Sequence, residues 1–242
     1  MARAEKAQHI GIVACSAEGA SLCYQTICLE AEAVMGRYLH PEVTMHTHSL
    51  GEYMRFIDEE NWEGVAGLIL DSAHKLQKAG CDFLICPDNT LHRVMHLVTP
   101  KSPLPWLHIA EEVAHEAGRR GYKKVGLTGT RFLVESQVYP NKLQAAGIVC
   151  VKPTNDERDE INRIIFEELV HGVFEPESLG YFQAVIERFR SEGCDAVVLG
   201  CTEIPLLVND ANSPLPTLDS TRLLARAALK RALIARAFPV AR

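Results

Sequence analysis

The sequence has 242 residues, of which 47% are hydrophobic and 23% charged, values typical of a soluble globular protein with a real core. A formal net charge of −6 does not favour a nucleic-acid-binding surface, and no apolar run reaches the ~18 residues of a membrane-spanning helix. The first nine residues are polar and lack a signal-peptide core. We therefore expect a cytoplasmic protein without nucleic-acid or membrane partners.

In the first part of the chain, short apolar runs alternate with amphipathic segments. The clearest helix is expected from Trp62 to Ala79, where apolar side chains recur at helical spacing. Strands are expected at residues 9–13, 43–48 and 82–86. Further helices are expected from the turn at residues 14–19 to about Leu39 and over residues 89–98. The proline-rich stretch at residues 100–105 predicts that the chain crosses there from one lobe to the other.

The pattern then restarts about 115 positions later with a strand and polar turn at residues 124–130. Further strands are expected at residues 148–152, 196–199 and 215–218, and helices ending near Ala145 and spanning 157–169, 179–190 and 221–237. Strands that alternate with helices predict an α/β fold with mostly parallel sheets. The repeat predicts two pseudo-symmetric lobes, one of residues 1–100 plus 215–242 and one of residues 101–214, with the active site in the cleft between them.

Two stretches carry the repeat most clearly: residues 80–90, GCDFLICPDNT, and residues 193–203, GCDAVVLGCTE. Each has Gly-Cys-Asp, an apolar run and then a small polar cluster. Asp88 and Cys201 are 113 positions apart, as are Cys81 and Cys194, so Asp88 and Cys201 occupy equivalent places in the two copies.

Four polar turns follow predicted parallel strands, where such sheets bind their ligands. They are Cys15-Ser16, Asp88-Asn89-Thr90, Thr128-Gly129-Thr130 and Cys201-Thr202. Because each turn leads into a helix, backbone N–H groups favour an anion there, and a carboxylate is the expected guest. The same position predicts a lowered thiol pKa for Cys201, which suits a nucleophile or a proton-transfer base.

The other cysteines and histidines have simpler explanations. All eight cysteines are expected to be reduced, because the chain is long and lacks a secretion signal. The spacing Cys-x-x-Cys is absent and no cysteine has a histidine at zinc-finger spacing, so no metal site is expected. His46-Thr47-His48 offers two imidazoles that could bind a metal, but strand alternation is enough to explain it. Asp88 could likewise be only an N-cap.

The motif Gly200-Cys201-Thr202-Glu203-Ile204-Pro205 and the run Asn89-Thr90-Leu91-His92 resemble the cofactor-independent aspartate/glutamate racemases. This resemblance extends over nearly the whole chain and implies a two-lobed homodimer without cofactor that acts on a small carboxylate, an amino acid. It also implies that two groups on opposite faces move the α-proton, with Cys201 as one of them. By the same resemblance, Asn89, Thr90, Thr130 and Thr202 bind the substrate, and we expect Cys15 and Ser16, in the turn after the first strand, to bind it as well.

The chain departs from the family pattern at several of these positions. Asp88 stands where the first catalytic cysteine, or in some relatives a threonine, belongs, and Ala14-Cys15 stand in place of Gly-Gly. We therefore expect a racemase or epimerase with a Cys201/Asp88 pair. Two alternatives stay open: a one-thiol decarboxylase or isomerase of a small dicarboxylic acid, and a non-catalytic carboxylate-binding protein.

Overall fold

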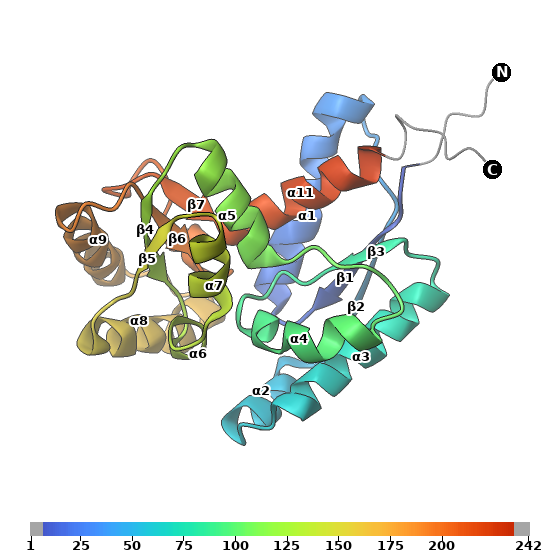
Figure 1. Cartoon of the computed structure of the whole chain (residues 1–242), viewed down its shortest axis with the longest axis horizontal. Helices are drawn as coiled ribbons and strands as arrows, with labels where there is room; N and C mark the ends of the chain where they lie inside the picture. Colours follow the sequence, from blue (N-terminus) through green and yellow to red (C-terminus); the bar gives the residue numbers. More distant parts are fainter. Residues whose placement is uncertain (1–6, 235–242) are drawn as a thin grey trace. The chain divides into compact units, whose positions relative to one another are not determined.

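The computed structural model describes residues 7–234, which form two compact units (Figure 1). Unit 1 holds residues up to Pro87, Val94–His108 and the segment from Leu224; unit 2 holds Asp88–Arg93 and Ile109–Leu223. Two predicted segments lie partly outside the described residues. They are the polar N-terminal segment, of which residues 1–6 are not described, and the last expected helix, of which residues 235–237 are not described. The predicted α/β architecture with parallel sheets is confirmed in both units.

Unit 1 is built on a parallel sheet of strand order β2-β1-β3. Helix α3 packs on β1 and β2 from one side of this sheet, while α1 and the end of α11 (Ser220–Ile234) lie on the other side (Figure 1). The guanidinium of Arg231 stacks on the ring of Phe83, 4.6 Å from its centroid. The elements of this unit are β1 (Ile10–Ala14), α1 (Ala17–Met35), β2 (Val43–Thr47), α2 (Leu50–Asp58), α3 (Trp62–Lys78), β3 (Phe83–Ile85), α4 (Met95–Val98) and the 3₁₀ turn Thr99–Lys101.

Unit 2 is built on a parallel sheet of strand order β5-β4-β6-β7. Strand β6 is buried on both faces: Val197 and Leu199 join a core with α8 and α9, and Ala196 and Val198 join a core with α5 and α7. Such two-sided burial explains its continuous apolar sequence. The elements are α5 (Ile109–Arg119), β4 (Lys124–Thr128), α6 (Arg131–Val134), α7 (Val138–Ala145), β5 (Val149–Val151), α8 (Asn155–Glu167), the 3₁₀ turn Leu169–His171, α9 (Pro176–Ser191), β6 (Ala196–Leu199), α10 (Ile204–Leu207) and β7 (Thr217–Asp219).

Two elements contain residues of both units. The 3₁₀ helix η1 (Thr90–Val94) begins in unit 2, and its last residue belongs to unit 1. Helix α11 (Ser220–Ile234) begins in unit 2 and continues into unit 1.

The two Gly-Cys-Asp sequences perform the same local task in each unit. Gly80 and Gly193 adopt φ angles of +88° and +82°, a left-handed conformation that glycine adopts without steric cost after α3 and α9. The aspartate of each sequence accepts a backbone hydrogen bond at the start of a strand inside the sheet. Asp82 Oδ2 accepts from His9 N, just before β1, at 2.6 Å, and Asp195 Oδ2 accepts from Lys124 N, the first residue of β4, at 3.0 Å. The repeat in the sequence is therefore a repeat of backbone geometry.

The units are divided differently from the lobes expected from the sequence. Residues 101–108 belong to unit 1, because Leu84 N donates to Pro105 O and Leu107 N donates to Leu84 O along the edge of β3. Strand β7 belongs to unit 2, because it pairs with β6 in the register Val198 to Leu218. Edge pairing by backbone hydrogen bonds, which the sequence pattern does not specify, decides both assignments.

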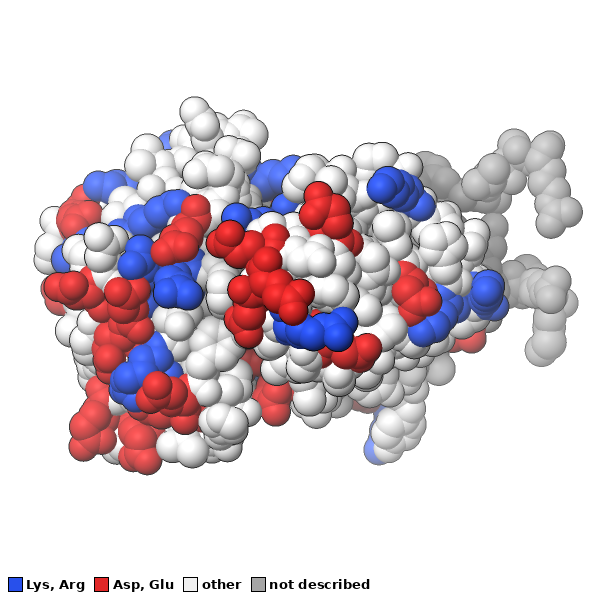
Figure 2. Space-filling view, turned by 90° about the horizontal axis from the view of Figure 1, so that it is seen from below, with Lys and Arg blue, Asp and Glu red and all other residues white. Residues whose placement is uncertain are grey.

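The charged side chains form local pairs. On the face drawn in Figure 2, Lys and Arg are interspersed with Asp and Glu and do not form one continuous basic surface. Several charged side chains of the protein pair within one helix or between neighbouring helices, for example Arg163 with Glu160 and Arg188 with Glu157. None of the helices within residues 7–234 is both long and apolar enough to cross a lipid bilayer.

Candidate functional site

The candidate site lies where the chain of unit 2 reverses its direction of winding. From β4 the chain moves outward to β5, and it then returns past β4 to β6 and β7. Parallel sheets bind ligands beyond the carboxyl ends of the strands at such a switch point. The turns that leave β4 and β6 carry Thr130 and Cys201, so two of the predicted site residues flank this position.

The two turns are packed backbone to backbone. Gly200 N donates to Thr128 O at 2.9 Å, and a Cβ atom on Gly200 would lie only 2.5 Å from that oxygen and 2.7 Å from Leu133 Cδ2. A Cβ on Gly129, whose φ is +156°, would meet Gly200 O at 3.0 Å. The residue before Cys201 must therefore be glycine for the turn to sit this close to β4.

We expect Gly200→Ala to lower the free energy of unfolding by about 1–3 kcal/mol, because the added methyl group clashes with backbone that cannot move away. This corresponds to a fall in melting temperature of about 2–4 °C per kcal/mol in thermal unfolding. Gly180→Ala is the matched control: Gly180 lies in the interior of α9 and a Cβ there meets nothing within 4 Å. That control should be neutral or more stable, and equal losses in both variants would contradict the packing argument.

A third predicted turn, Asp88-Asn89-Thr90, also belongs to unit 2. The hydroxyl of Thr90 is hydrogen-bonded to that of Thr130 at 3.0 Å. Asn89 is buried and held on both sides of its amide, since Tyr139 Oη donates to its Oδ1 at 2.7 Å and its Nδ2 donates to Ser220 Oγ at 3.0 Å. These bonds fix the turn beside the ends of β4 and β6.

Asp88 has the geometry of an N-cap. Its Oδ1 accepts a hydrogen bond from Leu91 N at 3.0 Å, at the start of the short helix from Thr90 to Val94. Asp88 is also close enough to Cys201 that its carboxylate raises the pKa of the thiol. The two equivalent positions of the sequence repeat therefore lie near one another within one unit.

The pKa of Cys201 differs from the prediction. Burial raises the pKa of this thiol well above its ordinary value, and the charge of Glu203 raises it further, whereas we predicted a lowered pKa. The predicted effect is weak because α10, the helix that follows, has only four residues and begins after Glu203. The thiol donates a hydrogen bond to Glu203 Oε2 at 2.8 Å, so Cys201 holds its proton at neutral pH.

Thr202 faces the same carboxylate, since its hydroxyl donates to Glu203 Oε2 at 2.8 Å. Both Thr202 and Glu203 are buried. Cys15 and Ser16 follow β1 in unit 1, where Ser16 Oγ caps α1 by accepting from Gly19 N at 3.3 Å. The structure thus brings Asp88, Asn89, Thr90, Thr130, Cys201 and Thr202 into unit 2, and Cys15 and Ser16 into unit 1.

Sequence reasoning did not identify three residues that shape this site: Glu203, Tyr139 and Ser220. Glu203 was visible in the motif, where an acidic residue two positions after a candidate thiol was a usable signal. Tyr139 and Ser220 lie 50 and 131 positions from Asn89 and carry no local signal. Among residues 7–234, the one group of three side chains at metal-binding distances lies in unit 1, so this site offers no such group of its own.

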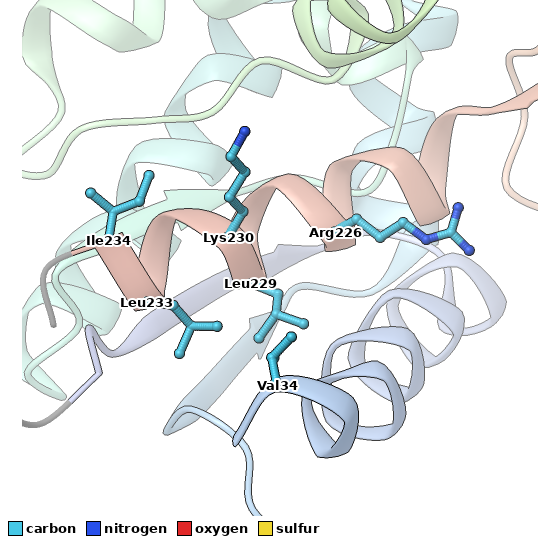
Figure 3. A pocket seen from close by; sticks show the side chains of 6 residues that line it. All are labelled: Val34, Arg226, Leu229, Lys230, Leu233 and Ile234. Carbon is cyan, nitrogen blue, oxygen red and sulfur yellow. The ribbon is translucent and has the colours of Figure 1, made fainter. Parts of the chain in front are cut away.

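Unit 1 has a separate apolar hollow of about 390 Å³ between the end of α1 and α11 (Figure 3). Val34 and Leu229 face one another across it, and Arg226 and Lys230 project from α11 (Figure 3). Val34 lies near the C-terminal end of α1, and Ser16 at its N-terminal end. Because a 19-residue helix is about 28 Å long, this hollow is not part of the turn that follows β1.

Comparisons with known proteins agree on one family. The family model described as Asp/Glu/Hydantoin racemase matches residues 10–228. The fold resembles a putative Asp/Glu racemase from Yersinia pestis (30% identity, TM-score 0.86, 93% of this chain and 99% of that one). It also resembles an aspartate racemase homologue from Pyrococcus horikoshii OT3 (29%, 0.79, 93% and 99%). The broad specificity amino-acid racemase RacX of Bacillus subtilis is 27% identical over 161 residues, 65% of this chain and 68% of that protein.

Proposed function

This chain belongs to the aspartate/glutamate/hydantoin racemase family and is an isomerase of the amino-acid racemase class, and we propose that it inverts the α-carbon with Cys201 and Asp88 on opposite faces. In this proposal the substrate is aspartate, glutamate or a related small carboxylate, and no pyridoxal phosphate or metal takes part. A homodimer in the cytoplasm belongs to the same proposal.

The observation that supports the pair most directly is the approach of the Asp88 turn to the Cys201 turn within unit 2. The Thr90–Thr130 hydrogen bond of 3.0 Å ties the first turn to the end of β4, and Gly200 packs the second turn against the same strand. Because the two turns lie close together, the charge of Asp88 raises the pKa of the Cys201 thiol. Two ionisable groups at equivalent positions of a repeat suit a reaction that must act on two faces of one carbon.

The proposed step moves one proton off and one proton on. When the one proton of the pair has moved from Cys201 to Asp88, the Cys201 thiolate takes the α-proton, so that an S–H bond forms and the C–H electron pair delocalises into the substrate carboxylate. Protonated Asp88 then donates its proton to the opposite face and becomes a carboxylate. The reverse direction uses Asp88 as base and the Cys201 thiol as acid, and the pair regains its starting state by proton exchange. Such a pair works with a single proton shared between two coupled groups.

The threonines of the turns supply donors for the substrate carboxylate. In the Thr90–Thr130 pair only one hydroxyl hydrogen lies in the mutual bond, so the other hydroxyl can donate elsewhere. Donors directed at a carboxylate whose charge grows in the transition state contribute most to such a reaction. Asn89, held by Tyr139 and Ser220, acts in this proposal mainly by orienting the turn. The substrate-binding roles of Thr202, Cys15 and Ser16 stay predictions.

In this proposal, Glu203 disfavours loss of the single proton that Cys201 and Asp88 share. Its carboxylate accepts the Cys201 thiol hydrogen, and its charge raises the thiol pKa. The active one-proton form therefore persists to alkaline pH and is lost only when Cys201 ionises. In Glu203→Gln the negative charge is removed, the pKa of Cys201 falls, and the alkaline limb of the kcat/KM profile should move to lower pH. Comparison with the unchanged protein on the same substrate cancels titration of the substrate amino group, and an unshifted limb would contradict this role.

The test of the function is α-proton exchange in heavy water. Each enantiomer of aspartate, glutamate and a panel of other amino acids is incubated with the protein, and deuterium at Cα is followed by NMR together with the appearance of the opposite enantiomer by chiral chromatography. We expect both signals for at least one substrate. Absence of exchange and of inversion across the whole panel would refute the proposed activity.

A second function is favoured by one observation, the cap bond from Leu91 N to Asp88 Oδ1. If Asp88 serves only as a cap, Cys201 protonates an enolate from one face alone, as a decarboxylase or isomerase of a small dicarboxylic acid would require. Release of CO₂ from a panel of substituted malonates, without α-proton exchange in amino acids, would identify this reaction. The negative charge of Asp88 beside a dianionic substrate disfavours it.

A further inference from the structure

His46, His48 and Asp71 form a cluster in unit 1 that the proposed reaction does not use. His46 lies on the edge strand β2, and His48 directly follows that strand. Alternate residues of a strand point to the same side, so both imidazoles face α3, which packs on β2 and carries Asp71. One ligand atom from each of the three side chains lies within 4.8 Å of the others.

The surrounding contacts orient these three side chains. Ser72, which is fully buried, has its Oγ within hydrogen-bond distance of His46 Nδ1 at 2.9 Å, whereas Glu52 Oε2 lies 3.9 Å from His48 Nδ1, too far for a hydrogen bond. His48 Nε2 is 2.8 Å from Asp71 Oδ2. Metal-binding histidines commonly have an oxygen partner on the second ring nitrogen, which fixes the ring and the tautomer, and Ser72 supplies one for His46.

We propose that His46, His48 and Asp71 bind a divalent metal ion with the coordination chemistry of Zn²⁺. Two imidazoles and a carboxylate form one of the ligand sets of zinc. Donors on one zinc ion lie about 3.4 Å apart, so the outermost pair of atoms must approach by at most roughly 1.4 Å. The Asp71 side chain is half exposed, which leaves it room for this small movement. The bound ion ties the edge strand β2 to α3.

The ammonium group of Lys75 competes with a metal ion for the carboxylate of Asp71. Its Nζ lies 2.6 Å from Asp71 Oδ2, on the oxygen that also meets His48. A metal ion must displace this ammonium and is repelled by it. Lys75→Met should therefore strengthen metal binding several-fold, whereas a cluster held together only by its hydrogen bonds would gain no metal affinity from the loss of Lys75.

The experiment measures Co²⁺ and Zn²⁺ binding by isothermal titration to chelator-treated full-length protein, with the visible d–d absorption of Co²⁺ as a second readout. We expect one equivalent per chain with nitrogen and oxygen ligands. Binding should weaken at least tenfold in His46→Gln, His48→Gln and Asp71→Asn, and about tenfold in Ser72→Ala. Thermal unfolding without metal establishes that each variant is folded.

Two controls separate this site from other surface ligands. His74→Ala removes an exposed histidine of the same helix, and a Cys28→Ser, Cys150→Ser double variant removes the two most accessible thiols. Both should bind Co²⁺ as the unchanged protein does. Failure of Co²⁺ to bind, or binding that survives in His48→Gln and Asp71→Asn, overturns the proposal. Because binding is measured without substrate, this outcome is independent of the racemase test.

Discussion

Cys201→Ser is expected to lower kcat/KM for racemisation by about 10³-fold, the middle of the range for loss of one acid/base group. A serine hydroxyl keeps the hydrogen bond to Glu203 but is too weak an acid to exchange a proton with an α-carbon near neutral pH. The measurement is the initial rate of inversion by circular dichroism, with thermal unfolding to verify the fold. Deuterium incorporation at Cα should fall in parallel.

The matched control for Cys201→Ser is Cys194→Ser. Cys194 is a buried thiol that precedes the same strand β6 and packs in the same core as Cys201. The charged groups that act on it, Lys124 and Glu192 among them, belong to no candidate site, and burial raises its pKa, so it serves as a packing residue. Its replacement should cost stability and leave kcat/KM nearly unchanged. If the two variants lose the same activity, Cys201 has no special role in proton transfer.

Asp88→Asn is expected to lower kcat/KM by about 10²–10³-fold with little change in stability. Asparagine caps a helix about as well as aspartate, so the amide oxygen of the variant side chain still accepts from Leu91 N. The amide, however, cannot take or return a proton. This substitution therefore separates the cap from the acid/base role, and the rates are measured with both enantiomers as substrate.

Further variants at residue 88 sharpen the interpretation. Asp88→Ala removes cap and proton carrier together, and should lose about 1 kcal/mol of stability in addition to activity. Asp88→Cys supplies a thiol where the family pattern has one, so it should be more active than Asp88→Asn. Full racemase activity in Asp88→Asn would show that Asp88 is only a cap and would contradict its proposed acid/base role.

Local sequence signals predicted much of the fold because they act over a few residues. Alternating apolar strands and amphipathic helices specified the α/β class, and the helix expected from Trp62 is present and ends at Lys78. The two Gly-Cys-Asp sequences also indicated a repeat. In the structure, each has a glycine with a positive φ and an aspartate that accepts a backbone hydrogen bond at the start of a strand. The helices α2 and α5 were not predicted, although both are strongly amphipathic and their buried side chains recur at helical spacing.

The sequence by itself determined the fold class, the family resemblance and the equivalence of Asp88 with Cys201, since these depend on residue type and spacing along the chain. Only the tertiary structure decided that β7 pairs with β6, that residues 88–93 belong with unit 2, and that Tyr139 and Ser220 hold Asn89. It also reversed the expected direction of the Cys201 pKa shift. The physical reason is that backbone pairing, burial and the charges around a side chain come from segments distant in sequence, whose approach no local pattern encodes.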